Sequence, residues 1–329
     1  MRDATPQAIQ LHDYLPPAFR ISQVHLDVDI GDREVTVRST LHVARNAEAK
    51  RPDAPLVLDG EGLELLSAAI DGRTLDEGDY RLDATHLTIP GVADAFTLQT
   101  VVRFDPWKNT RLEGLYATAS GLVTQCEAQG FRRITFFIDR PDVMARYVVA
   151  ICAERARFPR LLANGNLLEE GEGVPPGWFS APKEGGGARH WARWDDPFAK
   201  PSYLFALVAA NLDLLEEHFA TRSGKDALLQ IYVERGKLDH AGFAMQALKK
   251  CMRWDEERFG LELDLERFMI VAVSDFNAGA MENKGLNIFN TKYILARADT
   301  ATDADYFAVD KVIAHEYFHN WTGNRVTCR

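Results

Sequence analysis

The chain has 329 residues, of which 46% are hydrophobic and 26% are charged, and its formal net charge is -10. This composition is typical of a globular protein with a substantial hydrophobic core, and it excludes a long intrinsically disordered chain. No stretch concentrates Lys and Arg into a basic surface, so we expect no nucleic-acid partner.

The N-terminal residues 1–15 are polar and lack the apolar run of a secretory signal peptide. The longest apolar run, residues 203–210, is far shorter than the roughly 20 residues that span a bilayer, so we expect no membrane partner. A chain of this size needs no disulfides, and its cysteines form no C-x-x-C pair. We therefore expect the cysteines to be reduced thiols and the protein to be cytoplasmic. The four cysteines are Cys126, Cys152, Cys251 and Cys328.

The first domain is predicted over residues 1–210, where hydrophobic and polar residues mostly alternate from residue 19 onward. Val24 and Leu26, for example, are flanked by His25 and Asp27. This period of two is typical of half-buried antiparallel strands, and Gly-Asp or Asp-Gly dipeptides at residues 31–32 and 71–72 predict tight turns. The Gly- and Pro-rich residues 171–187 predict an exposed loop or hairpin tip. We therefore predict an all-β first domain.

A second domain is predicted over residues 211–329, with strands at residues 228–233 and 267–273. Gly260 is expected to end a helix between these strands. That helix is predicted from apolar residues at helical spacing, namely Leu238, Ala241, Met245, Leu248 and Met252. Thr302 and Asp305 resemble a capping box that opens another helix. The sequence therefore predicts an α+β multidomain protein.

The last predicted helix carries the segment His315-Glu316-Tyr317-Phe318-His319, an H-E-x-x-H pattern. Residues four apart on a helix are separated by about 40° of rotation, so both imidazoles project from one face. This arrangement suits zinc, and Glu316 follows the first histidine in the general-base position of zinc peptidases. The alternative is a chance match on an ordinary helix.

A second segment, Gly279-Ala280-Met281-Glu282-Asn283, lies upstream of the H-E-x-x-H pattern. With it, the chain resembles the aminopeptidase N family of zinc metallopeptidases, whose members pair G-A-M-E-N with H-E-x-x-H followed by a glutamate. The resemblance is closest to the bacterial branch and covers nearly the whole chain. Further matches to the family are residues 125–128, 131–133, 139–142, 283–285 and 320–325.

The resemblance implies that His315 and His319 ligate Zn²⁺ and that Glu316 activates water. It also implies that Glu282 and Glu127 hold the free α-ammonium group of a peptide, a task that suits carboxylates because they form charge-assisted hydrogen bonds. The alternative for each of these two glutamates is a solvated surface charge.

Other substrate-binding residues are expected around the same segment. The backbone of Gly279 and Ala280 is expected to line the substrate like an added strand, with a simple turn as the alternative. Gln125 and Met281 are expected to line the pocket for the first side chain of the peptide substrate, although Met281 also suits a core position. Asn283 is grouped with them as the last residue of the segment. As a further hypothesis, Ala278 leaves room for bulky N-terminal side chains, which an Ala278→Leu variant tested on Ala and Phe substrates would check.

The family pattern places a third zinc ligand near position 338 and a tyrosine that stabilises the oxyanion further on, both past Arg329. We therefore expect the N-terminal part of a longer enzyme, with a partial thermolysin-like catalytic domain and little activity alone. The predicted parent activity is release of N-terminal residues from peptides with a free N-terminus. The alternatives are a zinc endopeptidase and a non-catalytic binding or scaffolding fragment with an incomplete metal site.

Overall fold

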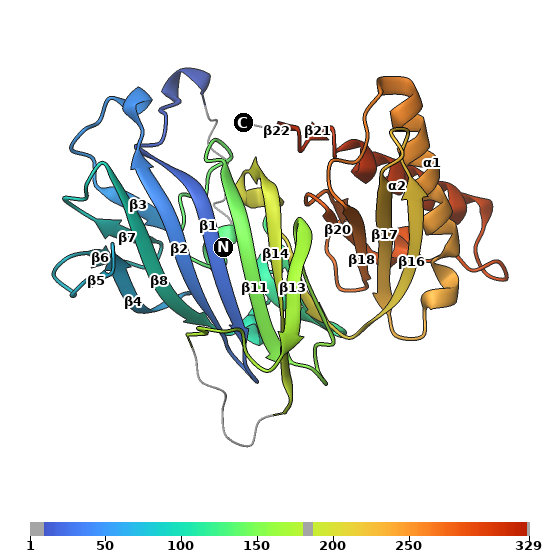
Figure 1. The fold of residues 1–329 in the computed structure, drawn as a ribbon, viewed down its shortest axis with the longest axis horizontal. Coiled ribbons are helices and arrows are strands. Elements are labelled where there is room, and N and C mark those ends of the chain that lie inside the picture. The colour runs from blue at the N-terminus through green and yellow to red at the C-terminus, as the bar shows by residue number, and fades with distance from the viewer. Residues whose placement is uncertain (1–9, 180–186, 328–329) are drawn as a thin grey trace.

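The computed structural model of the chain describes residues 10–179 and 187–327. Cys328, most of the polar N-terminal segment and the tip of the Gly- and Pro-rich segment lie outside the described residues. The chain forms a β-rich first part, followed by a second part in which two helices cover one sheet (Figure 1). The predicted α+β fold class, with a β-rich part preceding the helices, is confirmed.

The largest sheet of the first part has eight strands, and its long strand β1 has its hydrophobic residues buried between mostly exposed or half-buried polar ones. The predicted turn after β1 is present, because Gly31 donates its N–H to the carbonyl of Glu34. At the predicted second turn, Asp71 and Gly72 both have positive φ, as a tight hairpin requires. In sheet order the strands are β13 (Asn166–Glu172), β14 (Arg189–Lys200), β11 (Ala145–Glu154), β1 (Phe19–Ile30), β2 (Val35–Arg45), β8 (Ala95–Phe104), β4 (Glu64–Ile70) and β5 (Arg73–Thr74).

Two smaller sheets complete the first part. The segment predicted as a loop at residues 171–187 begins inside β13, because Gly171 and Glu172 are the last residues of this strand. β13 and β14 pair as an antiparallel hairpin, and residues 180–186 between them lie outside the described residues. The four-stranded sheet contains β12 (Arg160–Ala163), β15 (Leu207–Ala210), β10 (Gly121–Gln125) and β9 (Gly114–Thr118). The three-stranded sheet contains β3 (Leu56–Asp59), β7 (His86–Ile89) and β6 (Arg81–Leu82). The end of β10 leads directly to Glu127, so this sheet places one of the predicted site residues.

The second part is built on a five-stranded sheet with parallel pairing in its centre. Its strands in order are β16 (Leu212–Ala220), β17 (Asp226–Glu234), β18 (Arg267–Val273), β20 (Leu286–Asn290) and β19 (Ala280–Met281). Sheet membership changes between Ala210 and Leu212. This change supports the predicted domain boundary at residues 210 and 211, which remains a prediction.

Both faces of this sheet are buried, and β18 shows how. Phe268, Ile270 and Ala272 belong to the hydrophobic core under the helices, whereas Met269 and Val271 belong to the larger core shared with the first part. A strand covered on both faces has a nearly continuous apolar sequence. This is why the sequence predicts a buried strand at residues 267–273, and the structure confirms that strand as β18. Burying one such side chain contributes about 1.5–3 kcal/mol to the free energy of unfolding. The residues of β18 that face the larger core therefore stabilise the contact between the two parts.

Helices α1 (Gly242–Phe259) and α2 (Asp303–Phe318) lie on the side of this sheet away from the first part (Figure 1). The predicted end of α1 is confirmed, because Gly260 caps it in the left-handed conformation with φ of 69°. The capping box of α2 is also confirmed, with Thr302 and Asp305 bonded reciprocally. The predicted start of α1 is wrong: Leu238 lies in a separate 3-10 turn at Leu238–His240 and is exposed, because the helix begins only at Gly242.

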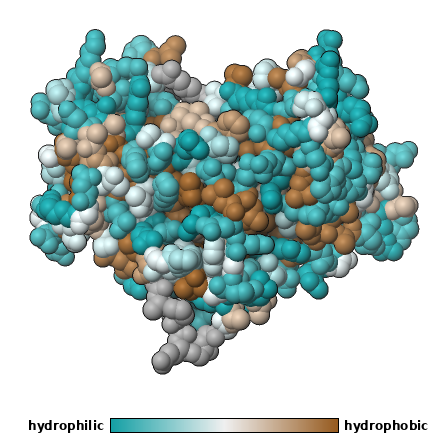
Figure 2. All heavy atoms as spheres, viewed as in Figure 1, coloured by the Kyte–Doolittle hydropathy of each residue, from teal (hydrophilic) through white to brown (hydrophobic). Residues whose placement is uncertain are grey.

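The surface mixes hydrophilic residues with smaller hydrophobic patches on the face shown in Figure 2. No helix in the described residues combines the length and apolar character needed to cross a membrane. Cys126, Cys152 and Cys251 are buried free thiols.

Candidate active site

The end of α2 brings His315 and His319 together. Their Nε2 atoms lie 3.1 Å apart, and their ring planes are inclined by 86°. Two nitrogens bound at about 2.0–2.1 Å to one tetrahedral zinc ion are about 3.3 Å apart. The two imidazoles therefore fit adjacent ligand positions on one metal ion.

The ring of His319 is oriented by the segment that follows α2. Its Nδ1 atom lies 2.7 Å from the backbone oxygen of Thr322, a distance at which Nδ1–H donates a hydrogen bond to this carbonyl. The proton on Nδ1 leaves Nε2 as the lone-pair nitrogen, and Nε2 is the atom that faces His315. Supporting hydrogen bonds of this kind are typical of metal-ligating histidines.

Gly323 makes room for this arrangement. It has φ of 131°, which side chains rarely allow, and it lies in the short strand β21 (Thr322–Gly323), which pairs with β22 (Val326–Thr327). A Cβ atom at this position would lie 3.0 Å from Nδ1 of His319 and 3.6 Å from Oε1 of Glu282. The glycine is therefore needed both for the backbone conformation and for the close approach of two site residues.

We expect a Gly323→Ala variant to bind zinc more weakly than the unmodified protein. The positive φ costs alanine on the order of 1–3 kcal/mol, and the added methyl group presses on the His319 ring. Zinc titration against a chromogenic chelator measures the change. The control is Gly224→Ala, which also has positive φ but whose Cβ would contact nothing within 4 Å. Equal zinc affinity in both variants would contradict this role of Gly323.

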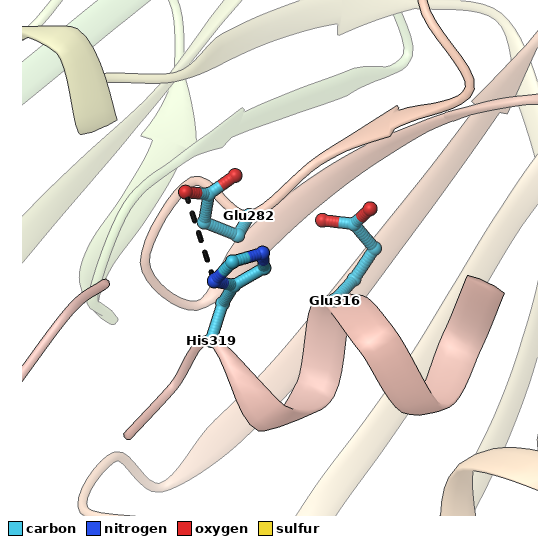
Figure 3. Close-up of side chains that lie close together, drawn as sticks. All are labelled: Glu282, Glu316 and His319. Atoms are coloured by element: carbon cyan, nitrogen blue, oxygen red, sulfur yellow. Dashed lines mark ion pairs between the residues drawn. The ribbon is translucent and has the colours of Figure 1, made fainter. Parts of the chain in front are cut away.

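Glu282 faces the end of α2 from the loop after β19 (Figure 3). Its Oε1 atom lies 4.0 Å from Nδ1 of His319, and its side chain is 15% exposed. Asn324 fixes the backbone of this loop, because its Nδ2 donates to the oxygen of Glu282 at 3.2 Å and its N–H donates to the oxygen of His319 at 2.9 Å. One asparagine thus joins Glu282 to the end of α2.

Glu316 points from α2 into the same space as Glu282 (Figure 3). It is only 6% exposed because it lies on the helix face that also buries Val309 and Ile313, and its Oε2 atom has no hydrogen-bond partner. Burial, together with the negative charges of Glu282 and Glu127, raises the pKa of Glu316 to about 8. A bound cation would act in the opposite direction and favour the carboxylate.

Glu127 comes from the first part and lies just after β10. Partial burial of its carboxyl group raises its pKa, and the charge of Glu282 raises the pKa further, whereas His319 acts in the opposite direction. Gln125 is buried and donates from Nε2 to the backbone oxygen of Glu127 at 3.3 Å. The fold therefore brings Glu127 within electrostatic range of residues near the end of α2.

Gly279 and Ala280 lie at an edge of the five-stranded sheet. Ala280 starts β19, the last strand in the sheet order, and Gly279 accepts a hydrogen bond from the N–H of Asn290. Gly279 and Ala278 are exposed, and Ala280 is half-buried. Within the described part of the chain, β19 pairs only with β20, so it is an edge strand of this sheet.

Met281 and Asn283 are placed differently from the other members of this group. Met281 is 2% exposed and packs in the larger core, and Asn283 is 0% exposed. The backbone oxygen of Asn283 accepts hydrogen bonds from Leu286 and Asn287, which closes the turn after Glu282. Both side chains are buried in this structure, and their contact with a substrate stays a prediction.

The described residues offer two sets of metal donors that share His319. One set is the pair of Nε2 atoms from His315 and His319. The other is a group of Glu282, Glu316 and His319, whose donor atoms all lie within 4.8 Å of one another. The imidazole pair and the partnerless Oε2 of buried Glu316 both suit a metal ion, so the residues present fit a zinc site.

Sequence reasoning assigned no role to Thr322, Gly323 and Asn324, although they lie in one of the matching segments. The available signal was a glycine next to an asparagine directly after a metal-binding pattern, which predicts a turn close to the ligands.

Two family models match the chain. The model described as the Peptidase M1 N-terminal domain matches residues 20–204, and the model described as the Peptidase family M1 domain matches residues 243–329. The first match covers the β-rich part except β15, and the second covers α1 from its second residue, all of α2 and the candidate metal site.

Three similar proteins agree with these matches. Aminopeptidase N of Caulobacter vibrioides is 52% identical over 100% of this chain and 36% of the relative, and aminopeptidase N of Escherichia coli is 50% identical over 98% and 35%. The crystal structure of Legionella pneumophila aminopeptidase A in complex with aspartic acid has a TM-score of 0.88 and 35% identity, covering 96% of this chain and 36% of that one. The chain thus spans about a third of the length of these relatives. With both halves matched, the resemblance predicted from the sequence is confirmed, and the chain belongs to peptidase family M1.

Proposed function

We propose that these residues carry the catalytic centre of a zinc-dependent aminopeptidase that hydrolyses N-terminal residues from peptides. The observation that carries this proposal is the convergence of Glu282, Glu316 and His319 around the end of α2, with Glu127 within electrostatic range. The bacterial relatives named aminopeptidase N support it, because they match 100% and 98% of the chain.

His315 and His319 would hold zinc through their Nε2 atoms. When bound, zinc would act as a Lewis acid and lower the pKa of its bound water from about 15.7 to about 7. Glu316 accepts the proton from the attacking water at its carboxylate and returns it to the leaving amine, the general-base and general-acid role that buried carboxyl groups perform. The buried position of Glu316 keeps bulk water from competing for this proton.

Glu282 and Glu127 would bind the α-ammonium group of the substrate. The charge of Glu282 raises the pKa of Glu127, so the two carboxylates repel each other when no cation is present. An ammonium group bound to both would offset this repulsion and receive charge-assisted hydrogen bonds. A peptide with a blocked N-terminus carries no such cation, so it gains neither effect.

The edge of β19 would align the rest of the peptide. An extended chain adds to an exposed sheet edge through backbone hydrogen bonds, which hold a substrate without regard to its sequence. β19 is short and lies directly before Glu282, so a peptide paired with it would place its N-terminus near that carboxylate.

Cleavage of matched peptides with free and N-acetylated ends tests this function on the full-length natural protein. We expect zinc-dependent hydrolysis of the free peptide and little hydrolysis of the acetylated one. Equal cleavage of both would favour the zinc endopeptidase alternative, for which the edge of β19 alone would suffice. No hydrolysis of either peptide by the zinc-loaded protein would favour a non-catalytic binding protein.

A Glu282→Gln variant tests the ammonium site. We expect KM for a free peptide to rise by about 10- to 100-fold, because a hydrogen bond to a charged group contributes about 1.5–3 kcal/mol. Steady-state kinetics on the full-length natural protein measures the change. The control is Glu64→Gln, which breaks an exposed ion pair with Arg103 in the eight-stranded sheet and should leave KM unchanged. An unchanged KM for Glu282→Gln would exclude this residue from amine binding.

A cytoplasmic location is also a proposal. Three buried free thiols, Cys126, Cys152 and Cys251, support it because such cysteines suit a reducing compartment. Cell fractionation followed by immunoblotting would test it.

A further inference from the structure

Lys284 lies in the loop that carries Glu282, and its side chain is buried, which is unusual for a lysine. It is only 3% exposed, and its Nζ atom lies 2.9 Å from Oδ2 and 3.1 Å from Oδ1 of Asp264. The same Nζ lies 4.6 Å from the ring centre of Phe198 on β14. A buried ammonium group is stable only with a counter-ion, so the position of Lys284 depends on Asp264.

The same carboxylate also binds the segment that follows α2. Nε of Arg325 lies 3.2 Å from Oδ2 of Asp264, and the Arg325 guanidinium also donates to the backbone oxygen of Glu262. Arg325 directly follows Asn324, the residue that joins Glu282 to the end of α2. Asp264 therefore connects two segments that are 41 residues apart in sequence, at Lys284 and Arg325.

The backbone of Lys284 is held from the first part of the molecule. Asn164 is buried and donates from Nδ2 to the oxygen of Lys284 at 2.9 Å and to the oxygen of Leu204 at 3.0 Å. Its Oδ1 accepts the N–H of Ala206 at 2.7 Å, so both the nitrogen and the oxygen of its amide group have partners. With its carbonyl bound to Asn164 and its ammonium bound to Asp264, Lys284 has little freedom to move.

We propose that Asp264 is a positioning residue that sets the location of the Glu282 carboxylate relative to His319, through Lys284 on one side and Arg325 on the other. This inference rests on the proposed function, in which Glu282 binds the substrate amine. Glu282 is two residues from Lys284, and its backbone oxygen is held one residue before Arg325. A shift of either segment therefore moves the amine-binding carboxylate.

Neutralising Asp264 would leave the buried ammonium of Lys284 without a counter-ion. The ammonium would have to leave its contact with Phe198 or draw water inward, because an uncompensated buried charge is strongly unfavourable. Either response displaces the loop at residues 282–285. Displacements of about 1 Å in positioning groups are enough to cost about 100-fold in function, so the effect should be measurable.

The experiment compares the binding of two probes by calorimetric titration into the zinc-loaded, full-length natural protein. L-alaninol has a free amine and no bond to hydrolyse, and N-acetyl-L-alaninol has the amine blocked. We expect the unmodified protein to prefer the free amine, and Asp264→Asn to weaken binding of the free amine about tenfold while changing binding of the acetylated probe little. Asp264→Glu, which keeps the charge, should recover part of the loss.

The matched control is Asp213→Asn. Asp213 is also a partly exposed aspartate, bound to Arg235 at 3.3 Å, but it lies on β16 at the opposite edge of the sheet from β19. This variant should bind both probes as the unmodified protein does. If Asp264→Asn does not fold, Lys284→Met replaces it, because this change removes the bond to Asp264 and keeps an apolar chain against Phe198. It leaves no uncompensated ammonium, so a smaller loss of free-amine binding is expected, again with little change for the acetylated probe.

The outcomes separate this inference from the proposed function. If the unmodified protein does not distinguish the two probes, the amine site fails and the role of Asp264 fails with it. If the unmodified protein prefers the free amine and Asp264→Asn keeps the same preference, the proposed function stands and the positioning role is overturned. An equal loss for both probes would also overturn it, since that pattern indicates a general structural effect.

Discussion

A Glu316→Gln variant of the full-length natural protein should hydrolyse a free peptide with kcat reduced by about 1000-fold, the middle of the range for losing a general acid or base. Glutamine has nearly the same shape as glutamate but cannot accept the proton from water. The imidazoles of His315 and His319 are untouched, so zinc content should remain that of the unmodified protein. KM should change little, because substrate amine binding depends on other carboxylates.

The control for this prediction is Glu257→Gln, an exposed glutamate on α1. Its kcat should equal that of the unmodified protein. Elemental analysis of each variant separates loss of chemistry from loss of metal. A Glu316→Gln variant that retains zinc and full activity would show that another group handles the proton.

Replacing either histidine should remove the metal. We expect His319→Ala and His315→Ala to lower apparent zinc affinity by more than about 100-fold, beyond the 10- to 100-fold typical of losing only a supporting group. The reason is that each variant leaves only one imidazole of the pair separated by 3.1 Å. Competition with a chromogenic chelator at fixed pH measures the affinity.

The control for the histidine variants is His218→Ala. His218 is exposed on β16 and bonded to Asp226, so its removal should leave zinc binding intact. If His315→Ala retained zinc as well as this control does, the alternative donor group of Glu282, Glu316 and His319 would be favoured. Loss of zinc in both histidine variants would support the imidazole pair.

Local features of the fold followed from the sequence because short-range chemistry determines them. The alternation around Val24 and Leu26 corresponds to β1, and the reciprocal bonds of Thr302 and Asp305 begin α2 where the capping box predicts. The placement of His315 and His319 on one face also follows from helix geometry. Each of these features involves residues within a few positions of one another.

Features that depend on distant residues were not available from the sequence pattern. β1 pairs with β11 in parallel, with Val24 opposite Tyr147, and no local pattern specifies such a partner. The burial of Met281 was weighed as an alternative but could not be decided, because β19 has only two residues, too few for an alternation to indicate which side chain faces inward. The burial of Asn283 was not predicted, because it depends on a turn after β19 that no sequence alternation describes. The sequence motifs indicated candidate site residues but not the direction of each side chain.

The most direct test of the zinc site is anomalous X-ray diffraction at the zinc absorption edge from crystals of the zinc-loaded protein. We expect one strong peak about 2.0–2.1 Å from Nε2 of both His315 and His319, with the carboxylate of Glu316 nearby but not bound. A peak bound by Glu282, Glu316 and His319 and remote from His315 would contradict the assignment of Glu316 as general base and Glu282 as amine ligand.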